Sequence, residues 1–583
     1  MKYTIKRLPQ VQDEHLQDIA DPLIRQCYAR RGVTASQQTL SLKQLLPPDN
    51  LKNIDRAAAY LADAVMQDQS VLIVGDFDAD GATSTAICLL ALRAMGANRV
   101  DFLIPNRQTM GYGLTPELVA TVPADVDWLL TVDNGITSFA GVQQAHARGM
   151  RVMITDHHLA GDTLPGADVI VNPNQPDCAF PSKAIAGCGV AFYVMIALRQ
   201  VLQSRGWFEA AQVSVPNLAT LLDLVALGTV ADVVPLDINN RILVQAGLHR
   251  IRQGRSRLGI TALMDITKKK PWRLSATDIG FAIAPRLNAA GRLDDMRLGV
   301  QLLITEDPVE AKTIAQALDD LNKRRKALES TMVADAVAAL DQLKLTSSAE
   351  VKALAVYQPD WHQGVVGIVA SRLKERNYRP VIAFSQAEPG LLKGSARSID
   401  GVHIRDMLTA VDRQYPGLIV NYGGHAMAAG LTIHAAAFVD FKAAWEHVAA
   451  TEIPCDRLQG ELWSDGALAT AQLDLRTALA IQASGPWGQQ FAEPVFDNEF
   501  WCLDIQVMAQ AHLRFELMTL DRTRRLSAVM FRADIDAWLA RPVQRVHLVY
   551  RLNINDYRQE SLQLLVLQAE SCFNEAVSKQ KVG

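Results

Sequence analysis

Three aspartates at alternate positions are the residues in this sequence whose types and spacing most directly suggest chemistry. Asp76, Asp78 and Asp80 follow the apolar run at residues 71–74, and Gly81 comes directly after them. Carboxylates this close repel one another unless a cation lies between them. The segment therefore predicts a metal site at a turn that joins a strand to a helix.

Polar residues follow the other apolar runs of the same region. Runs at residues 71–74, 100–104, 128–132, 152–154 and 169–171 alternate with helical segments, which is typical of βαβ units in a mostly parallel sheet. Ligands bind such sheets beyond the carboxyl ends of the strands. The residues that we expect along this one edge are Asp76, Asp78, Asp80, Arg107, Asp133, Asp156, His157 and His158.

A later apolar segment, residues 221–235, contains two further carboxylates, Asp223 and Asp232. Burying either of them without a partner would cost several kcal/mol, so either could face the metal crevice, and the sequence leaves the choice open. Carboxylates with one or two imidazoles favour Mg²⁺ or Mn²⁺. Five or more ligands fit two ions about 4 Å apart, with a bridging water that attacks a phosphoryl group in line.

Other interpretations of the first motif are weaker. Asp-x-Asp-x-Asp-Gly could open an EF-hand loop, but that loop needs Glu at its twelfth position, where this chain has Ile87. Any one of the aspartates could also be only a helix N-cap. Because acidic residues follow three strands of the same sheet, a shared metal site explains them better.

Composition narrows the class of protein. The chain has 583 residues, enough for three or four domains, and a net charge of −4, so any polyanion must bind to local basic patches. The seven cysteines show no zinc-ligand spacing, which indicates reduced thiols and a cytoplasmic protein. No apolar run approaches the ~20 residues that span a bilayer, so we expect no membrane association.

The pattern along the chain predicts a multidomain α/β protein with an added β-barrel. We expect an N-terminal helical segment at residues 1–65, a parallel-sheet catalytic domain at 66–306 and a connecting helix at 307–345. A second α/β domain follows at 346–452, and a small barrel of the oligonucleotide-binding (OB) kind at 455–575.

Motifs in this order resemble the DHH phosphoesterase superfamily, and within it the bacterial exonucleases specific for single-stranded DNA. The resemblance covers nearly the whole chain. It is carried by residues 76–81, 132–135, 156–158, 224–232, 285–292, 423–425 and 485–488. Many relatives have a histidine where this chain has Val74, and Asp76 could compensate for it.

The resemblance implies hydrolysis of single-stranded DNA from its 5′ end, in the 5′-to-3′ direction, with Mg²⁺ or Mn²⁺ and release of mononucleotides in DNA repair and recombination. The second domain would be of the DHHA1 type, the protein a monomer, and single-stranded DNA-binding protein a partner. The implied catalytic residues are Asp78, Asp80, Asp133, Asp156, His157 and His158, with Asp76, Asp223 and Asp232 as further candidate metal ligands. The implied contacts to DNA or its 5′-phosphate are Arg107, Arg286, Asn288, Arg292, Ser395, Arg397 and His425.

Two other functions belong to the same superfamily. A phosphodiesterase for short oligonucleotides or cyclic dinucleotides would generally lack the C-terminal barrel. A nonenzymatic replication scaffold would not need acidic residues at every strand end.

Overall fold

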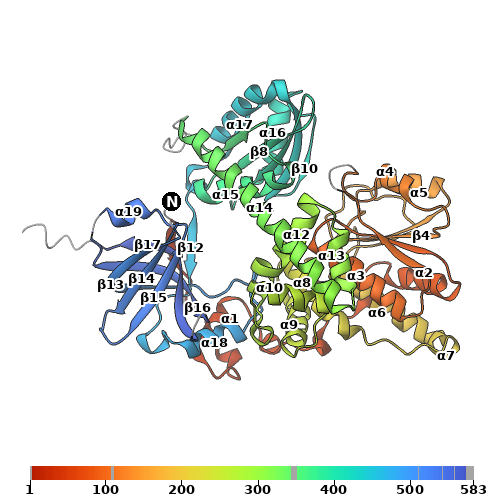
Figure 1. Cartoon of the computed structure of the whole chain (residues 1–583), viewed down its shortest axis with the longest axis horizontal. Coiled ribbons are helices and arrows are strands. Elements are labelled where there is room, and N and C mark those ends of the chain that lie inside the picture. Colours follow the sequence, from red (N-terminus) through yellow and green to blue (C-terminus); the bar gives the residue numbers. More distant parts are fainter. Residues whose placement is uncertain are drawn as a thin grey trace, which may run out of the picture. The chain divides into compact units, whose positions relative to one another are not determined.

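The computed structural model describes residues 3–106, 110–342, 351–509, 511–540, 542–556 and 559–572 (Figure 1). The chain divides into two units, each described here by itself. Unit 1 comprises residues 1–10, 324–480 and 494–583, and unit 2 comprises residues 11–323 and 481–493. Within the described residues, no helix is both long and apolar enough to cross a membrane.

Unit 2 is built on a five-stranded sheet in which every neighbouring pair is parallel. Its strand order is β3-β2-β4-β5-β6, so the carboxyl ends of all five strands lie at one edge, as the sequence predicts. The central strands are apolar on both faces because helices cover both. The strands are β2 (Val71–Val74), β3 (Val100–Leu103), β4 (Trp128–Val132), β5 (Arg151–Thr155) and β6 (Val169–Val171).

Helices pack on the two faces of this sheet. One face packs its core side chains against α4 (Pro116–Thr121) and α5 (Phe139–Ala147). On the other face, α3 (Ala79–Ala94) and α2 (Ile54–Met66) both contact α6 (Gly187–Ser204). The remaining helices of unit 2 include α8 (Leu222–Ala231), α9 (Ile238–Arg252), α10 (Leu258–Ile266), α11 (Ala276–Asp278), the π-helix η7 (Ile279–Ile283), α12 (Ala284–Leu293) and α13 (Arg297–Ile304).

A long helix, α14 (Pro308–Gln342), follows, where the sequence predicts one. Its 35 residues correspond to about 50 Å at 1.5 Å per residue. The division between the two units falls within it, after Lys323.

Unit 1 contains a second α/β sheet with strand order β10-β11-β9-β8-β7. Only the β7–β8 pair is parallel. The strands are β7 (Leu354–Tyr357), β8 (Val381–Glu388), β9 (Leu391–Arg397), β10 (Asn421–Gly424) and β11 (Ala428–His434). Its helices are α15 (Gln363–Asn377), α16 (Ile404–Gln414) and α17 (Phe438–Glu452), and its core includes Phe384, Phe441 and Trp445.

The C-terminal part of unit 1 is a closed five-stranded barrel in the order β13-β14-β15-β17-β16. Side chains alternate between buried and partly exposed along β14, as expected for a strand with one face in a barrel core. The predicted α/β class with an added small barrel is therefore confirmed. The strands are β13 (Phe496–Met508), β14 (His512–Thr519), β15 (Arg525–Phe531), β16 (Arg545–Asn555) and β17 (Ser561–Ser571).

The prediction of a helical N-terminal segment is wrong for its first residues. The strand β1 (Thr4–Arg7) pairs in parallel with β12 (Glu461–Ser464) of the same unit. Arg7 also forms a 2.6 Å ion pair with the buried carboxylate of Asp497. Helix begins only later in the segment, at α1 (Pro22–Arg30). The first residues therefore associate with residues more than 450 positions further along the chain, which local periodicity could not indicate.

Candidate metal centre

The turn after β2 bears the three aspartates that the sequence singled out. Asp78 is the N-cap of α3, and its Oδ1 accepts hydrogen bonds from Asp80 N and Gly81 N, both at 3.0 Å. Asp76 is buried, and a Cβ at Gly81 would lie 2.5 Å from its carbonyl oxygen. Glycine is therefore needed for this close turn.

The end of β4 supplies a second wall of the site. Asp133 is buried and has a φ of +62°, in the left-handed region. Its neighbour Asn134 donates hydrogen bonds to the carbonyl oxygens of Val74 and Val132, which ties the ends of β4 and β2 together. Gly187, at the start of α6, lies so close that a Cβ there would be 2.4 Å from Asp133 Oδ1.

The end of β5 contributes Asp156, His157 and His158. Asp156 accepts a 2.7 Å hydrogen bond from His158 Nδ1 and a 2.9 Å bond from Ile136 N. Burial alone would raise the pKa of Asp156, but the hydrogen bond and charge of His158, with His157 and Ile136 N, together outweigh burial and lower this pKa. Burial opposes a charge on His158 as well, yet Asp156 raises its pKa to about 9. Asp156 therefore orients a positively charged His158.

Among the described residues, potential ligand atoms form two groups of three that share no residue. In each group, the atoms lie within 4.8 Å of one another. A further group joins His158 to Asp133 and His157. The two separate groups are Asp76, Asp78 and Asp133, and Asp80, His157 and Asp232.

The same residues include buried polar atoms without partners. Asp133 Oδ1 lies 3.1 Å from His157 Nε2, yet neither atom forms a hydrogen bond with any described residue. A buried polar atom without a partner costs free energy, which a coordinated cation would recover. A donor set of carboxylate oxygens and imidazole suits Mg²⁺ or Mn²⁺, so the residues present fit the predicted metal.

The charges of the site favour the same conclusion. Burial, assisted by Asp78, raises the pKa of Asp80 to about 6. Burial and neighbouring carboxylates raise the pKa values of Asp133 and Asp232 well above their usual range. Burial, with His158, lowers the pKa of His157 to about 4, so its imidazole is neutral and able to ligate. Without a cation, these carboxylates resist ionising together.

The structure distinguishes the two carboxylates between which the sequence could not choose. Asp223 accepts hydrogen bonds from Leu224 N and Arg257 N and lies 3.9 Å from Arg250 Nε. It belongs to none of the ligand groups formed by the described residues, whereas Asp232 does. The two are nine positions apart along α8, which places them about 14 Å apart along the helix and on opposite sides of it. Of the two carboxylates, Asp232 is therefore the one that lies in a candidate ligand group of the described residues.

The residues expected to contact DNA are distributed over both units. In unit 2, Arg286 is paired with Asp319 at 2.7 Å, and Asn288 Oδ1 accepts a 2.8 Å hydrogen bond from Ala79 N. Arg292 lies on the same helix, α12, and Arg107 lies outside the described residues. In unit 1, Ser395 and Arg397 of β9 both approach Gly367 of α15, and His425 follows β10.

Sequence reasoning missed two features of the centre. The N-terminus of α6 donates hydrogen bonds to Asp80 from Gly187 N, at 2.7 Å, and Cys188 N, at 3.0 Å. The glycines beside Cys188 were a signal that a backbone approaches closely here. Tyr112 packs its ring edge-on against Phe77 and His158, and the sequence around it gives no periodic signal.

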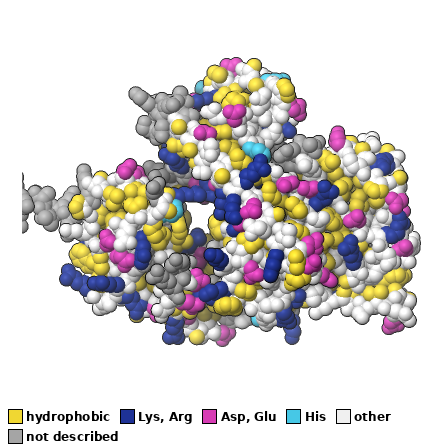
Figure 2. All heavy atoms as spheres, viewed as in Figure 1, with side chains coloured by type: hydrophobic (Ala, Val, Ile, Leu, Met, Phe, Trp, Pro, Cys, Tyr) yellow, Lys and Arg dark blue, Asp and Glu magenta, His cyan; other side chains and the backbone are white. Residues whose placement is uncertain are grey.

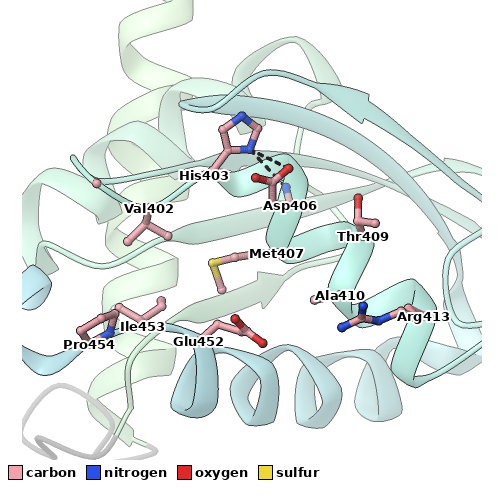
Figure 3. A pocket seen from close by; sticks show the side chains of 11 residues that line it. Val402, His403, Asp406, Met407, Thr409, Ala410, Arg413, Glu452, Ile453 and Pro454 are labelled. Carbon is pink, nitrogen blue, oxygen red and sulfur yellow. Dashed lines mark hydrogen bonds and ion pairs between the residues drawn. The ribbon is translucent and has the colours of Figure 1, made fainter.

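The charge distribution on the surface and one cavity in unit 1 can also be described. Figure 2 shows basic and acidic side chains interspersed over the visible face of unit 2, in keeping with the net charge of −4. A cavity of about 390 Å³ lies in unit 1 between α16 and the end of α17 (Figure 3). Its lining includes the apolar Val402, Met407 and Ile453 and the charged Arg413 and Glu452. None of the expected site residues lines this cavity.

Comparison with family models defines the class of the protein. The model described as "DHH family, N-terminal domain" matches residues 70–229, which include the parallel sheet and most of the candidate ligands. The "DHHA1 domain" model matches residues 350–451, and the "RecJ OB domain" model matches residues 464–568. The class is that of the DHH proteins.

Full-length relatives define the family within that class. The chain is 49% identical to the single-stranded-DNA-specific exonuclease RecJ of Dickeya dadantii, covering 96% of this chain and 98% of that protein. It is 47% identical to the RecJ of Escherichia coli, over 94% and 95% of the two chains. The crystal structure of Thermus thermophilus RecJ in complex with Mn²⁺ matches with a TM-score of 0.77 and 30% identity, covering 98% of this chain and 80% of that one. The chain belongs to the RecJ family.

Proposed function

We propose that this protein is a metal-dependent exonuclease that hydrolyses single-stranded DNA from its 5′ end, in the 5′-to-3′ direction, and releases mononucleotides. The observation that carries this proposal is the pair of three-residue ligand groups at the carboxyl edge of the parallel sheet. The substrate is that in the printed names of the relatives, each called a single-stranded-DNA-specific exonuclease. Thermus thermophilus RecJ has been crystallised with Mn²⁺ and with Mg²⁺.

The proposed chemistry assigns a role to each group of residues. Asp76, Asp78 and Asp133 would hold one ion, and Asp80, His157 and Asp232 the other. Two such ions, when bound, supply an activated water and neutralise charge on the phosphate.

His158 acts beside these ligands. Its pKa is raised to about 9, and Asp156 accepts the hydrogen bond from its Nδ1. The other ring nitrogen, Nε2, lies 3.5 Å from the Tyr112 hydroxyl, and we propose that it donates a hydrogen bond to a phosphate oxygen when DNA is bound. Asp156 positions this imidazole and keeps it protonated, without ligating an ion itself.

The remaining proposals concern the residues that bind the DNA strand, the location of the protein in the cell and its partner. We propose that Arg107, Arg286 and Arg292 bind backbone phosphates, and that Ser395, Arg397 and His425 bind the 5′-phosphate. A Cβ at Gly367 would lie 3.1 Å from Ser395 Oγ and 2.9 Å from Arg397 Nη2, which supports a common role for these two side chains. We further propose a cytoplasmic monomer that acts in DNA repair and recombination with single-stranded DNA-binding protein as a partner.

The test uses end-labelled strands of one sequence, single and double, digested with Mn²⁺ or with EDTA. We expect mononucleotides only from single strands with an accessible 5′ end and only with Mn²⁺. Asp133→Asn should lower the rate by at least about a thousandfold because one group loses its charge, while single-strand binding in Ca²⁺ stays within about twofold of wild type. Equal digestion of strands whose 5′ end is blocked, or unchanged turnover by the variant, would contradict the proposal.

A further inference from the structure

The helix α12 lies directly against the turn that bears Asp78 and Asp80. Asn288 Oδ1 accepts a 2.8 Å hydrogen bond from Ala79 N, across 209 positions of sequence. Gly291 lies one turn further along the same face of α12. It approaches the carbonyl oxygen of Phe77 so closely that a Cβ would lie 1.7 Å from it. Two contacts to backbone atoms therefore hold this turn from outside.

The hydrogen bond from Ala79 completes the cap of α3. The first N–H groups of a helix have no partner within it. Asp78, the N-cap, accepts from Asp80 N and Gly81 N but not from Ala79 N. Asn288 supplies the missing acceptor from another helix. The first turn of α3 is thus fixed by one side chain of its own and one from α12.

Ala79 stands between residues of the two ligand groups. Asp78 belongs to one group and Asp80 to the other. The position of the peptide between them sets how far apart and in which direction their carboxylates project. A side chain that holds this peptide consequently influences both groups together.

The helix that bears Asn288 is itself held in place. Arg286 pairs with Asp319 of α14 and donates a further hydrogen bond to Ala282 O. Leu287, Ala289 and Ala290 are buried. A side chain on such a helix can position its partner more precisely than one on a loop.

We infer that Asn288 is a positioning residue of the metal centre, which sets cation affinity through the backbone of Ala79, in place of the DNA contact expected from the sequence. The inference rests on the proposed metal centre. It predicts that the acceptor oxygen of residue 288 matters for Mn²⁺ binding, whereas its amide group does not matter for DNA binding.

The test measures Mn²⁺ binding to the full chain without DNA, from the electron paramagnetic resonance signal of free Mn²⁺. We expect Asn288→Ala to weaken Mn²⁺ binding about fivefold to tenfold, because one partly buried hydrogen bond is lost. Asn288→Asp keeps an acceptor oxygen in place, so it should bind Mn²⁺ at least as tightly as wild type. Single-strand affinity in Ca²⁺ should change less than about twofold in Asn288→Ala.

A matched control is Asn217→Ala, which removes a similar bond that Asn217 Oδ1 accepts from Ala219 N at the start of another helix in unit 2. This control should leave Mn²⁺ affinity unchanged. If Asn288→Ala does not fold, Asn288→Leu offers the same shape without an acceptor.

Unchanged Mn²⁺ affinity in Asn288→Ala, or loss of single-strand binding alone, would overturn the inference and leave the proposed function standing. Failure of the wild-type protein to bind Mn²⁺ would overturn both.

Discussion

Asp133 combines two costs that the folded chain must offset. Its backbone is in the left-handed region, with φ at +62°, and its carboxylate is buried beside other acidic groups. Strained and buried polar residues of this kind concentrate at functional sites. The residue therefore lowers the stability of the metal-free protein, and a bound cation would remove much of that cost.

The stability of the metal-free protein should accordingly fall as pH rises. The pKa of Asp80 is about 6 in the fold but near 4 when unfolded, so the unfolded chain releases its proton first. Its protonated carboxyl stabilises the fold fully below about pH 4, and this stabilisation, about 3 kcal/mol for two pKa units, is lost as pH rises through about 6. Asp133 and Asp232, with pKa values raised further, extend this loss to higher pH.

Thermal unfolding in EDTA and in Mn²⁺ measures this effect. Because Mn²⁺ binds the ionised carboxylates, it should raise the melting temperature more at pH 8 than at pH 5.5. In EDTA at pH 8, Asp133→Asn should be more stable than wild type, since it removes one buried charge and asparagine accepts the left-handed conformation. An equal effect of Mn²⁺ at the two pH values would argue against coupled carboxylates.

A site residue could be predicted from the sequence where the end of a strand determines its position, but not where tertiary packing does. Asp78, Asp80, Asp133 and His157 follow strands, and parallel strands bring their carboxyl ends to one edge. Asp232 could not be separated from Asp223, because that depends on how α8 is rotated about its axis. The bond from Ala79 to Asn288 was also out of reach, since tertiary packing alone brings these residues together.

At the scale of elements, the contact between α12 and the turn after β2 requires a glycine, without a side chain, at position 291. Gly291→Ala would place a Cβ 1.7 Å from the carbonyl oxygen of Phe77, and neither backbone can yield easily. We expect a loss of about 2–4 kcal/mol in urea unfolding and weaker Mn²⁺ binding.

Gly280→Ala is the control for this prediction. It lies in η7, just before α12, where the nearest atom to a Cβ would be 3.6 Å away. It should change stability by less than about 1 kcal/mol. Equal effects of the two substitutions would mean that helix propensity, rather than the close approach, decides the outcome.

The elements themselves were predicted where their signal is local. The strands of the parallel sheet are short apolar runs bounded by polar residues, so they could be found one at a time. The strand β1 has no such signal, because its side chains are mostly exposed and its partner lies more than 450 residues away.

At the scale of the whole molecule, the two units exchange short segments of chain. Residues 1–10 belong to unit 1, and residues 481–493, which precede the barrel, belong to unit 2. In that second segment, the rings of Trp487 and Phe491 are stacked with centroids 5.0 Å apart. The guanidinium of Arg241 lies 3.7 Å from the Phe491 ring.

Phe491→Ala should therefore loosen unit 2 rather than the barrel that follows it in sequence. We expect a loss of about 3 kcal/mol, since a buried aromatic ring is removed. Hydrogen exchange should become faster in peptides from residues 11–323 and stay unchanged in those from the barrel. Phe531→Ala, whose side chain is 57% exposed on β15, should change neither region by more than about 0.5 kcal/mol. Faster hydrogen exchange confined to the barrel would contradict the assignment of residues 481–493 to unit 2.

The π-helix η7 lies just before α12, so the number of residues in η7 determines which way the side chains of α12 face. A residue deleted between Ile279 and Ile283 would turn everything after it by about 100° about the helix axis. Asn288 and Gly291 would then face away from Ala79 and Phe77. Phe281, 81% exposed within η7, can be exchanged for other residues without that consequence. In this stretch a substitution at the exposed Phe281 should therefore be tolerated, whereas an insertion or a deletion should not.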